Sequence, residues 1–599
     1  NNMSLLENIK SQNDVKKLND EQSQLICDEI RKNIIDKVKE NGGHLASNLG
    51  IVETTVALCR IFDFKSDKII FDVGHQCYPY KIRTGRFDKF ATVRKKDGIS
   101  GFPDREESEY DSFISGHAGT SIGAGLGKCL ARDNKKEDYY VIDIVGDGAI
   151  SNGLNLEALT ANSEKPKKYI VILNDNGMSI SKNHNGFYQY ISEKRIDEKY
   201  VRRKRRIKKV FGESFITRFL RKFRNAIKRI LKLQNAFESF GFKYVGVFDG
   251  NNVNKMTKIL EKVKNYAKNE AVLLHIKTKK GKGFLEAEKH ADSYHGVGAN
   301  LALKTGAFSI AVGETLNEII QENKKVYALT AGMATGTGLK VVEDENPNNF
   351  IDVGIAEEYA VNLSAGMASE GLKPVVCIYS TFMQRVYDQV LHDVCIQNLP
   401  VVFCIDRAGL VGNDGKTHQG VFDLSFLSHL PNIKIYAPKS VSELKEMLKV
   451  ALKENCPVAI RYPNENDLCE NTSVFDGKWE RVSIGKDATI LAVGPRMNDL
   501  ANRIKEQVDV EIINARIVKP LDYEMLDSIK NDKIITIEEN SIIGGFGSQV
   551  ISYFEQKNNA KSIKTYGVPD RFIKNASVLE QLENCGLTLQ NILEQIKSF

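Results

Sequence analysis

The feature that most constrains how this chain can fold is a strand–helix–strand unit between residues 141 and 181. The apolar run VIDIV is followed by GDGA, and after a helical interval a second apolar run, YIVIL, is followed by NDN. Short apolar runs joined by a helix predict two parallel strands of one sheet. Because the carboxyl ends of parallel strands meet at one edge of a sheet, Asp147 and Asn176 are predicted to lie close together there.

The residue types at this edge favour a cation and an anionic group. Asp147 offers a carboxylate and Asn176 an amide oxygen, ligands that suit Mg²⁺, which usually keeps waters and phosphate oxygens in its other positions. Gly146 and Gly148 let a diphosphate approach the backbone, and a helix after Ala149 would present free N–H groups to it. A GDG tripeptide is also a common turn, so the motif alone is equally compatible with a structural role.

Three glycine–histidine pairs precede the GDG segment. His44 lies in GGHLASNLG, His75 follows the apolar run IIFDVG, and His117 lies in FISGHAGTSIGAGLGK. A single loop histidine is more often merely solvated. Three of them in loops and at predicted strand ends indicate a ligand site, because open α/β sheets bind ligands at the carboxyl ends of their strands.

Length and composition predict several folded domains. At 599 residues the chain is too long for one core, and strand-like runs alternate with helical intervals again at about 306–463 and 475–599. No apolar run approaches the roughly 18 residues of a membrane span, and no secretory signal is recognisable. Ten cysteines are scattered singly without a CxxC pair, which favours reduced thiols in a cytoplasmic protein.

One basic stretch accounts for the net charge of +7. Residues 202–232 contain 14 Lys or Arg and one acid, with aromatic and aliphatic residues near helical spacing, and the rest of the chain is mildly acidic. Such a basic amphipathic helix could contact nucleic acid or an anionic membrane. We favour the alternative, an excursion over residues 184–235 that packs loosely over the active site.

A second group of polar and aromatic residues follows the strand-like runs of the 306–463 block. They are Glu357, Tyr379, Phe382, Arg407, Asp414, His418 and Arg461. Their positions just past strands place them at the ligand-binding edge of a second sheet. The GNDGKT stretch is not a nucleotide phosphate loop, because Leu410 stands where the first glycine should be.

GDG…NDN in the first block and GIAEEYAV in the second together resemble the transketolase-like thiamine diphosphate enzymes. The resemblance covers nearly the whole chain apart from the basic excursion, and its other motifs are GGHLASNLG, DVGHQCYPYKIRTGR, NDNGMSIS, YSTFMQRVYDQVLHDV and DRAGLVGNDGKTHQG. It implies three doubly wound α/β domains: a diphosphate- and Mg-binding domain over residues 1–300, a pyrimidine-binding domain over 301–472 and a C-terminal transketolase-like domain over 473–599.

The resemblance also implies which residues hold the cofactor. Asp147, Asn176 and the main-chain carbonyl of Met178 would bind the metal that anchors the diphosphate. Glu357 would face a pyrimidine ring nitrogen as a carboxylic acid, buried on an apolar strand edge that raises its pKa. The remaining cofactor-binding residues implied are His75, Gly116, His117, Ala118, Gly148, Ala149, Phe284 and Phe382.

Within these enzymes the resemblance is closest to members that decarboxylate pyruvate and join the two-carbon unit to D-glyceraldehyde 3-phosphate. Arg407 and Arg461 would bind the acceptor phosphate, because a guanidinium group offers bidentate geometry that lysine cannot. A cytoplasmic homodimer without nucleic-acid or membrane partners is expected. The alternatives are a transketolase acting on ketose phosphates and, in another class, a nucleic-acid- or membrane-binding protein that uses residues 202–232.

Proton transfers are assigned by the same resemblance. His44 and His418 are candidates for moving protons to the donor and acceptor oxygens, in an order left open, and Asp414 and Tyr379 would orient them. The chain departs from the family pattern where Tyr359 replaces the histidine of an AEQH motif. It also departs at Gly119, which replaces a hydroxyl residue and would alter a hydrogen bond near the cofactor.

Overall fold

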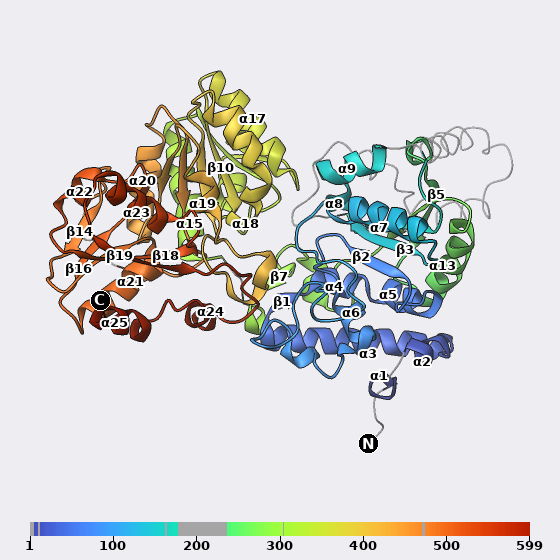
Figure 1. Cartoon of the computed structure of the whole chain (residues 1–599). Helices are drawn as coiled ribbons and strands as arrows, with labels where there is room; N and C mark the ends of the chain where they lie inside the picture. The colour runs from blue at the N-terminus through green and yellow to red at the C-terminus, as the bar shows by residue number, and fades with distance from the viewer. Residues whose placement is uncertain are drawn as a thin grey trace. The chain divides into compact units, whose positions relative to one another are not determined.

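The computed structural model describes residues 5–9, 12–161, 164–177, 236–302, 305–469 and 474–598. The predicted metal ligand Met178 and the whole of the predicted excursion, residues 184–235, lie outside these ranges. The chain divides into two compact units, Asn1–Ala91 with Phe102–Leu301 and Thr92–Gly101 with Ala302–Phe599. Each unit is described by itself, and Figure 1 labels its helices and strands.

The first unit is built on a five-stranded parallel sheet in the order β2-β3-β4-β6-β5. Its strands are β2 (Lys68–Phe71), β3 (Val141–Gly146), β4 (Tyr169–Asp175), β5 (Lys243–Asp249) and β6 (Val272–Lys277). Every residue of β4 is buried, which explains its unbroken apolar run, because a parallel sheet covered on both faces leaves no side to solvent. The parallel pairing of β3 with β4 confirms the predicted strand–helix–strand unit.

Helices of the first unit pack on this sheet and on one another. They include α3 (Asp20–Asn41), α5 (Val52–Ile61), α7 (Ser121–Lys135) and α13 (Val253–Ala267). α5 packs on α13 and α7 packs on β3. A short ribbon pairs β1 (Gly43–His44) with β7 (Gly296–Val297), so His44 lies opposite Gly296 although they are distant in sequence.

The second unit contains two further sheets. The seven-stranded sheet has the order β17-β12-β13-β11-β10-β8-β9, and the five-stranded sheet has the order β14-β16-β15-β18-β19. The strands of the first are β8 (Val326–Thr330), β9 (Phe350–Asp352), β10 (Lys373–Tyr379), β11 (Val402–Asp406), β12 (Lys434–Tyr436), β13 (Val458–Arg461) and β17 (Ile517–Lys519). Those of the second are β14 (Glu480–Ser483), β15 (Thr489–Ala492), β16 (Glu511–Asn514), β18 (Lys533–Ser541) and β19 (Ser562–Val568).

The three larger sheets are mainly parallel. In the second unit, the segment that forms the five-stranded sheet also contributes one strand to the seven-stranded sheet. Only β14 and β17 pair antiparallel with their neighbours in these two sheets. β17 comes from the predicted C-terminal domain yet forms the edge of the seven-stranded sheet beside β12. The predicted α/β fold class is therefore confirmed, with an exchange of one strand that the alternation of elements did not indicate.

The described residues include neither a membrane-spanning helix nor a disulfide bond. No helix among them is long and apolar enough to cross a membrane. All ten cysteines lie in the described ranges and carry free thiols, as their scattered spacing predicted.

Helix α7 provides a test of close packing against β3. A Cβ on Gly125 would lie 2.2 Å from an Asp143 carboxylate oxygen, whereas one on Gly127, two residues further on, would meet nothing within 4 Å. Gly127→Ala should therefore raise the thermal midpoint, through a gain of about 0.5–1 kcal/mol in helix propensity. Gly125→Ala should lower it, because overpacking a core costs roughly 1–3 kcal/mol. Scanning calorimetry of both variants checks this, and equal shifts of the same sign would contradict the packing.

Candidate active site

The predicted meeting of Asp147 with the chain after β4 is present. Asp147 is buried, and its Oδ2 accepts a hydrogen bond from the Gly177 N–H at 2.8 Å. The same N–H lies 3.0 Å from Asp175 Oδ1, and Asn176 is half-buried between these two residues of the turn. Burial, and then the nearby Asp175 carboxylate, raises the pKa of Asp147 to about 7. A bound cation would offset both effects and favour the ionised carboxylate.

The donor set here suits an ion that keeps outside ligands. Among the described residues, no three His, Cys, Asp or Glu side chains are arranged to enclose a metal. An ion at Asp147 would therefore take further oxygens from water, amide or main-chain groups, or phosphate, as Mg²⁺ does. Gly146 leaves open space where a side chain would stand, since a Cβ there would meet nothing within 4 Å.

The helix geometry after β3 differs from the prediction. The sequence predicted free N–H groups on a helix after Ala149, but α8 (Asp147–Ile150) begins at Asp147 itself, and α9 (Gly153–Thr160) follows a break. The Gly148 N–H is taken by Asp147 Oδ1 at 3.0 Å. Gly146 is the N-cap of α8, and the Asp147 carboxylate occupies one N–H donor of the first turn.

Lys280 is a member of this site that the sequence analysis missed. It follows β6, is buried, and interacts electrostatically with Asp147 and Asp292. Burial lowers the pKa of its ammonium to about 8, against the opposing effect of the two carboxylates. In the sequence it is one of several lysines in KTKKGKG, so nothing local distinguishes it.

Three histidines gather beside this edge of the sheet. The ring centroids of His44, His75 and His295 lie 5.1–5.8 Å apart. Asn48 joins the first two segments, because its Nδ2 donates to the carbonyls of both His44 and His75 at 2.8 Å. Burial, followed by the charge of Lys280, holds the pKa of His295 well below its usual range. His295 and Asn48 were not predicted, although HG at 295 mirrors the earlier GH pairs.

A buried carboxylate shapes the loop that carries His117. Asp72 follows β2, is fully buried, and accepts the N–H groups of Gly119 at 2.9 Å and Ser121 at 3.0 Å. These bonds hold the backbone at Gly119 and Ser121, directly after the predicted cofactor residues 116–118. Gly119 has φ +86°, a conformation that favours glycine, so the departure from the family's hydroxyl residue matches the local backbone.

Phe284 lies at the start of α14 (Leu285–Lys289) in the same unit. Its ring is half-buried and meets Tyr294 edge-on at 5.7 Å. The Lys39 ammonium lies over the same ring, 5.2 Å from the centroid of Phe284. The ring is thus held by packing, and its predicted role as a cover for the cofactor remains a prediction.

In the second unit, Glu357 is the first residue of α17 (Glu357–Ser369), after the turn that follows β9. It lies at a helix start rather than on a strand edge, yet it is only 3% exposed. Its Oε2 is buried and forms no hydrogen bond with any residue that the structure describes. Burial raises the pKa of Glu357 from 4.5 to about 7, with the Arg385 charge opposing the change. Such an acid can hold a proton at neutral pH and donate it to a ligand nitrogen.

Four predicted residues form one contiguous group past β10 and β11. The Arg407 guanidinium lies 3.8 Å above the Tyr379 ring, Tyr379 stacks on Phe382, and Phe382 meets His418 edge-on at 5.9 Å. Arg407 also donates to the Gly336 carbonyl at 2.9 Å. A Cβ on Gly336 would lie 1.7 Å from the Tyr379 hydroxyl oxygen, so only glycine leaves room for this arrangement.

Asp414 belongs to the same group through charge, and it has a partner that the sequence did not indicate. Its Oδ1 lies 2.6 Å from Arg94 Nη1, and it is close enough to influence the titration of Tyr379 and Arg407. Arg94 is buried and lies in the 92–101 segment, which the Asn575 side chain ties down through the Lys95 carbonyl at 2.7 Å. More than 300 positions separate the two charges, so no local pattern links them.

Arg461 is held more tightly than predicted. It ends β13, is buried, and binds Asp423 through Nε at 2.7 Å and Nη2 at 3.1 Å. Nη2 also lies 3.2 Å from the Glu539 carbonyl, so the predicted structural C-terminal block contributes to its placement. Nε and Nη2 are therefore both engaged within the protein.

Comparison with known proteins gives three family matches along the chain. Residues 6–278 match the model of 1-deoxy-D-xylulose-5-phosphate synthase, 305–467 match the transketolase pyrimidine-binding domain, and 477–592 match the transketolase C-terminal domain. The curated 1-deoxy-D-xylulose-5-phosphate synthases of Clostridium tetani and Clostridium beijerinckii are 44% and 46% identical to this chain. These alignments cover 99% and 98%, respectively, of both chains. A Campylobacter jejuni transketolase structure aligns at 16% identity over 97% of this chain and 100% of its own, with a TM-score of 0.43.

The α/β sheets and the family matches define a transketolase-like, thiamine diphosphate-dependent transferase. Within that class the full-length identity to curated relatives is decisive. The chain belongs to the 1-deoxy-D-xylulose-5-phosphate synthase family.

The buried Glu357 predicts a pH-dependent stability. Its pKa is higher in the native state than in the unfolded chain, so the native state holds the proton over that interval. The free energy of unfolding should therefore fall as pH rises from about 4.5 through 7. Glu357→Gln cannot ionise and should be more stable than the parent at about pH 8.5, by on the order of 2 kcal/mol, with the gain lost near pH 5. Thermal midpoints at both pH values check this.

Glu358→Gln is the matched control, because Glu358 is the next residue and less buried. It should show no such pH-dependent gain. If Glu357→Gln shifted the midpoint equally at both pH values, Glu357 would be ionised in the native state.

Proposed function

We propose that this chain decarboxylates pyruvate and joins the remaining two-carbon unit to D-glyceraldehyde 3-phosphate, giving 1-deoxy-D-xylulose 5-phosphate and CO₂. The family membership supports the reaction, and one local observation carries its assignment to this chain. Glu357 is buried, and its Oε2 has no hydrogen-bond partner in the part of the chain that the structure describes, which supports its assignment as the acid that activates thiamine diphosphate. When bound, that cofactor supplies the carbon nucleophile that accepts the two-carbon unit.

The chain's own residues divide into two tasks toward the cofactor. Asp147, Asn176 and the main-chain carbonyl of Met178 would hold Mg²⁺, which would anchor the diphosphate, and Lys280 adds a positive charge beside Asp147. Burial raises the pKa of Glu357 to about 7, which favours the protonated form relative to an exposed glutamate, and its Oε2 would donate that proton to a pyrimidine nitrogen. The residues proposed to line the cofactor are His75, Gly116, His117, Ala118, Gly148, Ala149, Phe284 and Phe382.

Substrate handling falls to the remaining polar residues. Arg461 and Arg407, which already pair with Asp423 and Asp406, bind the acceptor phosphate through further charge-assisted hydrogen bonds. His44 and His418 move protons at the donor and acceptor oxygens, while Asp414 and Tyr379 fix their surroundings. We expect the active form to be a homodimer.

One experiment separates this reaction from that of a transketolase. CO₂ release from labelled pyruvate is measured with thiamine diphosphate and Mg²⁺, with and without D-glyceraldehyde 3-phosphate, and again after chelation with EDTA. Turnover should require pyruvate, the cofactor and the metal, and Glu357→Gln should reduce it by roughly 10²-fold or more. Transfer from a ketose phosphate donor without release of CO₂ from pyruvate would refute the proposal in favour of a transketolase.

Arg461→Ala tests recognition of the acceptor phosphate. Loss of a charge-assisted contact commonly costs about 2 kcal/mol, so the KM for D-glyceraldehyde 3-phosphate should rise roughly thirtyfold while that for pyruvate changes little. Steady-state kinetics with each substrate varied in turn measures both constants. Unphosphorylated glyceraldehyde serves as the control acceptor, and an equal loss with it would mean that Arg461 does not bind the phosphate.

A further inference from the structure

The loop between β6 and α14 carries Lys280 and Phe284, two residues that the proposed function assigns to the cofactor. Gly281 and Gly283 in this loop have φ +77° and +85°. A Cβ on Gly283 would lie 2.3 Å from Arg31 Cδ, so the loop is pressed against α3. Because the loop belongs to no strand ladder, its position depends on contacts that other elements make with it.

A single buried carboxylate makes the most direct of these contacts. Glu53, on α5, is fully buried. Its Oε1 accepts hydrogen bonds from Arg31 Nη2 and from Lys282 Nζ, both at 2.6 Å, and its Oε2 accepts one from Asn251 Nδ2 at 3.1 Å. Glu53 therefore connects α3, α5, the turn after β5 and the 279–284 loop.

Asn251 extends this connection along the loop. Its Oδ1 accepts the Lys279 N–H at 2.6 Å, and its own carbonyl accepts Lys282 Nζ at 2.8 Å. The Gly281 N–H in turn donates to the Ala46 carbonyl of α4 (Ala46–Gly50) at 2.8 Å. Lys280 thus lies between Lys279 and Gly281, whose main-chain N–H groups are both hydrogen-bonded to other elements.

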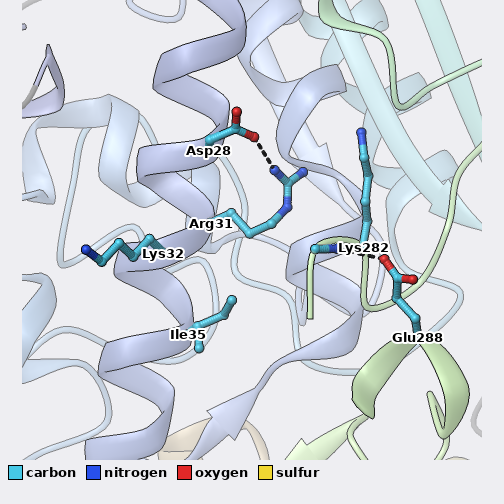
Figure 2. Close-up of a pocket in the computed structure, with 7 residues that line it drawn as sticks. Asp28, Arg31, Lys32, Ile35, Lys282 and Glu288 are labelled. Atoms are coloured by element: carbon cyan, nitrogen blue, oxygen red, sulfur yellow. Dashed lines mark hydrogen bonds and ion pairs between the residues drawn. The ribbon is translucent and has the colours of Figure 1, made fainter. Parts of the chain in front are cut away.

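Figure 2 shows this region from the side of a cavity of about 510 Å³ lined by α3 residues and by Lys282, Gly283 and Glu288. Arg31 binds Asp28 on this side at 3.1 Å. The Lys282 side chain is 28% exposed and borders the cavity, so its ammonium has water within reach. It nevertheless binds inward to Glu53, and the cost of burying that carboxylate is offset only while its cations stay in place.

We propose that Lys282, together with Glu53 and Asn251, is a positioning residue that fixes the 279–284 loop so that Lys280 and Phe284 are preorganised for thiamine diphosphate. The inference rests on the proposed function for the identity of the cofactor. It assigns a role to three residues that have no part in the chemistry. Removing the connection should weaken cofactor binding, because the loop must then be ordered at the expense of binding energy.

The test compares Lys282→Gln with Lys289→Gln, the same charge change on an exposed lysine of α14 that forms no ion pair with the described residues. Titration calorimetry with thiamine diphosphate and Mg²⁺ should give a dissociation constant about tenfold higher for Lys282→Gln and an unchanged one for Lys289→Gln. The kcat at saturating cofactor should stay within about twofold of the parent value. Hydrogen exchange of the Lys279, Gly281 and Gly283 amides should be faster in Lys282→Gln alone.

Two further variants keep the test decisive. Lys282→Arg retains the cation and should bind the cofactor as the parent does. Asn251→Ala removes the loop tether while Glu53 keeps both cations, so it should weaken binding even if Lys282→Gln fails to fold. Parent-like affinity in Asn251→Ala and Lys282→Gln would overturn the positioning role, whereas a parent protein that binds no thiamine diphosphate would overturn the proposed function instead.

Discussion

The architecture depends on hydrogen bonds from main-chain N–H groups to carboxylates at strand ends. In parallel sheets the ligand-binding loops lie at the carboxyl ends of the strands. An N–H group that is buried there without a hydrogen-bond partner destabilises the folded state. The buried Asp72 binds Gly119 and Ser121, and the half-buried Asp352 binds Gly332 and Gly354. These acids hold the loops in conformations that no strand or helix ladder would impose.

The same kind of group is available to a ligand when its hydrogen bonds are incomplete. Asp72 accepts several donors and has a structural role, whereas Glu357 keeps Oε2 without a partner among the described residues. Burial raises the pKa of both Asp147 and Glu357 to about 7. Asp147 lies next to the Asp175 carboxylate, and two neighbouring negative charges favour a bound cation. Glu357 has no second carboxylate at hydrogen-bonding distance among the described residues, so its burial favours a bound proton. Environment rather than residue type therefore separates the two roles.

The sequence predicted the framework of both sites because their residues follow strands. Periodicity located β3, β4, β10 and β11, and the carboxyl ends of those strands carry Asp147, Asn176, Tyr379 and Arg407. The prediction placed the helix after Ala149, whereas α8 begins at Asp147 with Gly146 as its N-cap, and a second helix, α9, begins at Gly153. The assignment of roles to these residues remains a prediction.

By itself the sequence determined the class of fold, the parallel order of β3 and β4, and the family, because these depend on local periodicity and on motifs of neighbouring residues. Only the tertiary structure decided that β17 joins the sheet of another block and that Arg94 reaches Asp414. It also decided that Asp423 and Glu539 hold Arg461 and that Glu53 collects two cations. Such partners are distant in the chain and meet only because burying a charge requires a counter-charge wherever the packing provides one.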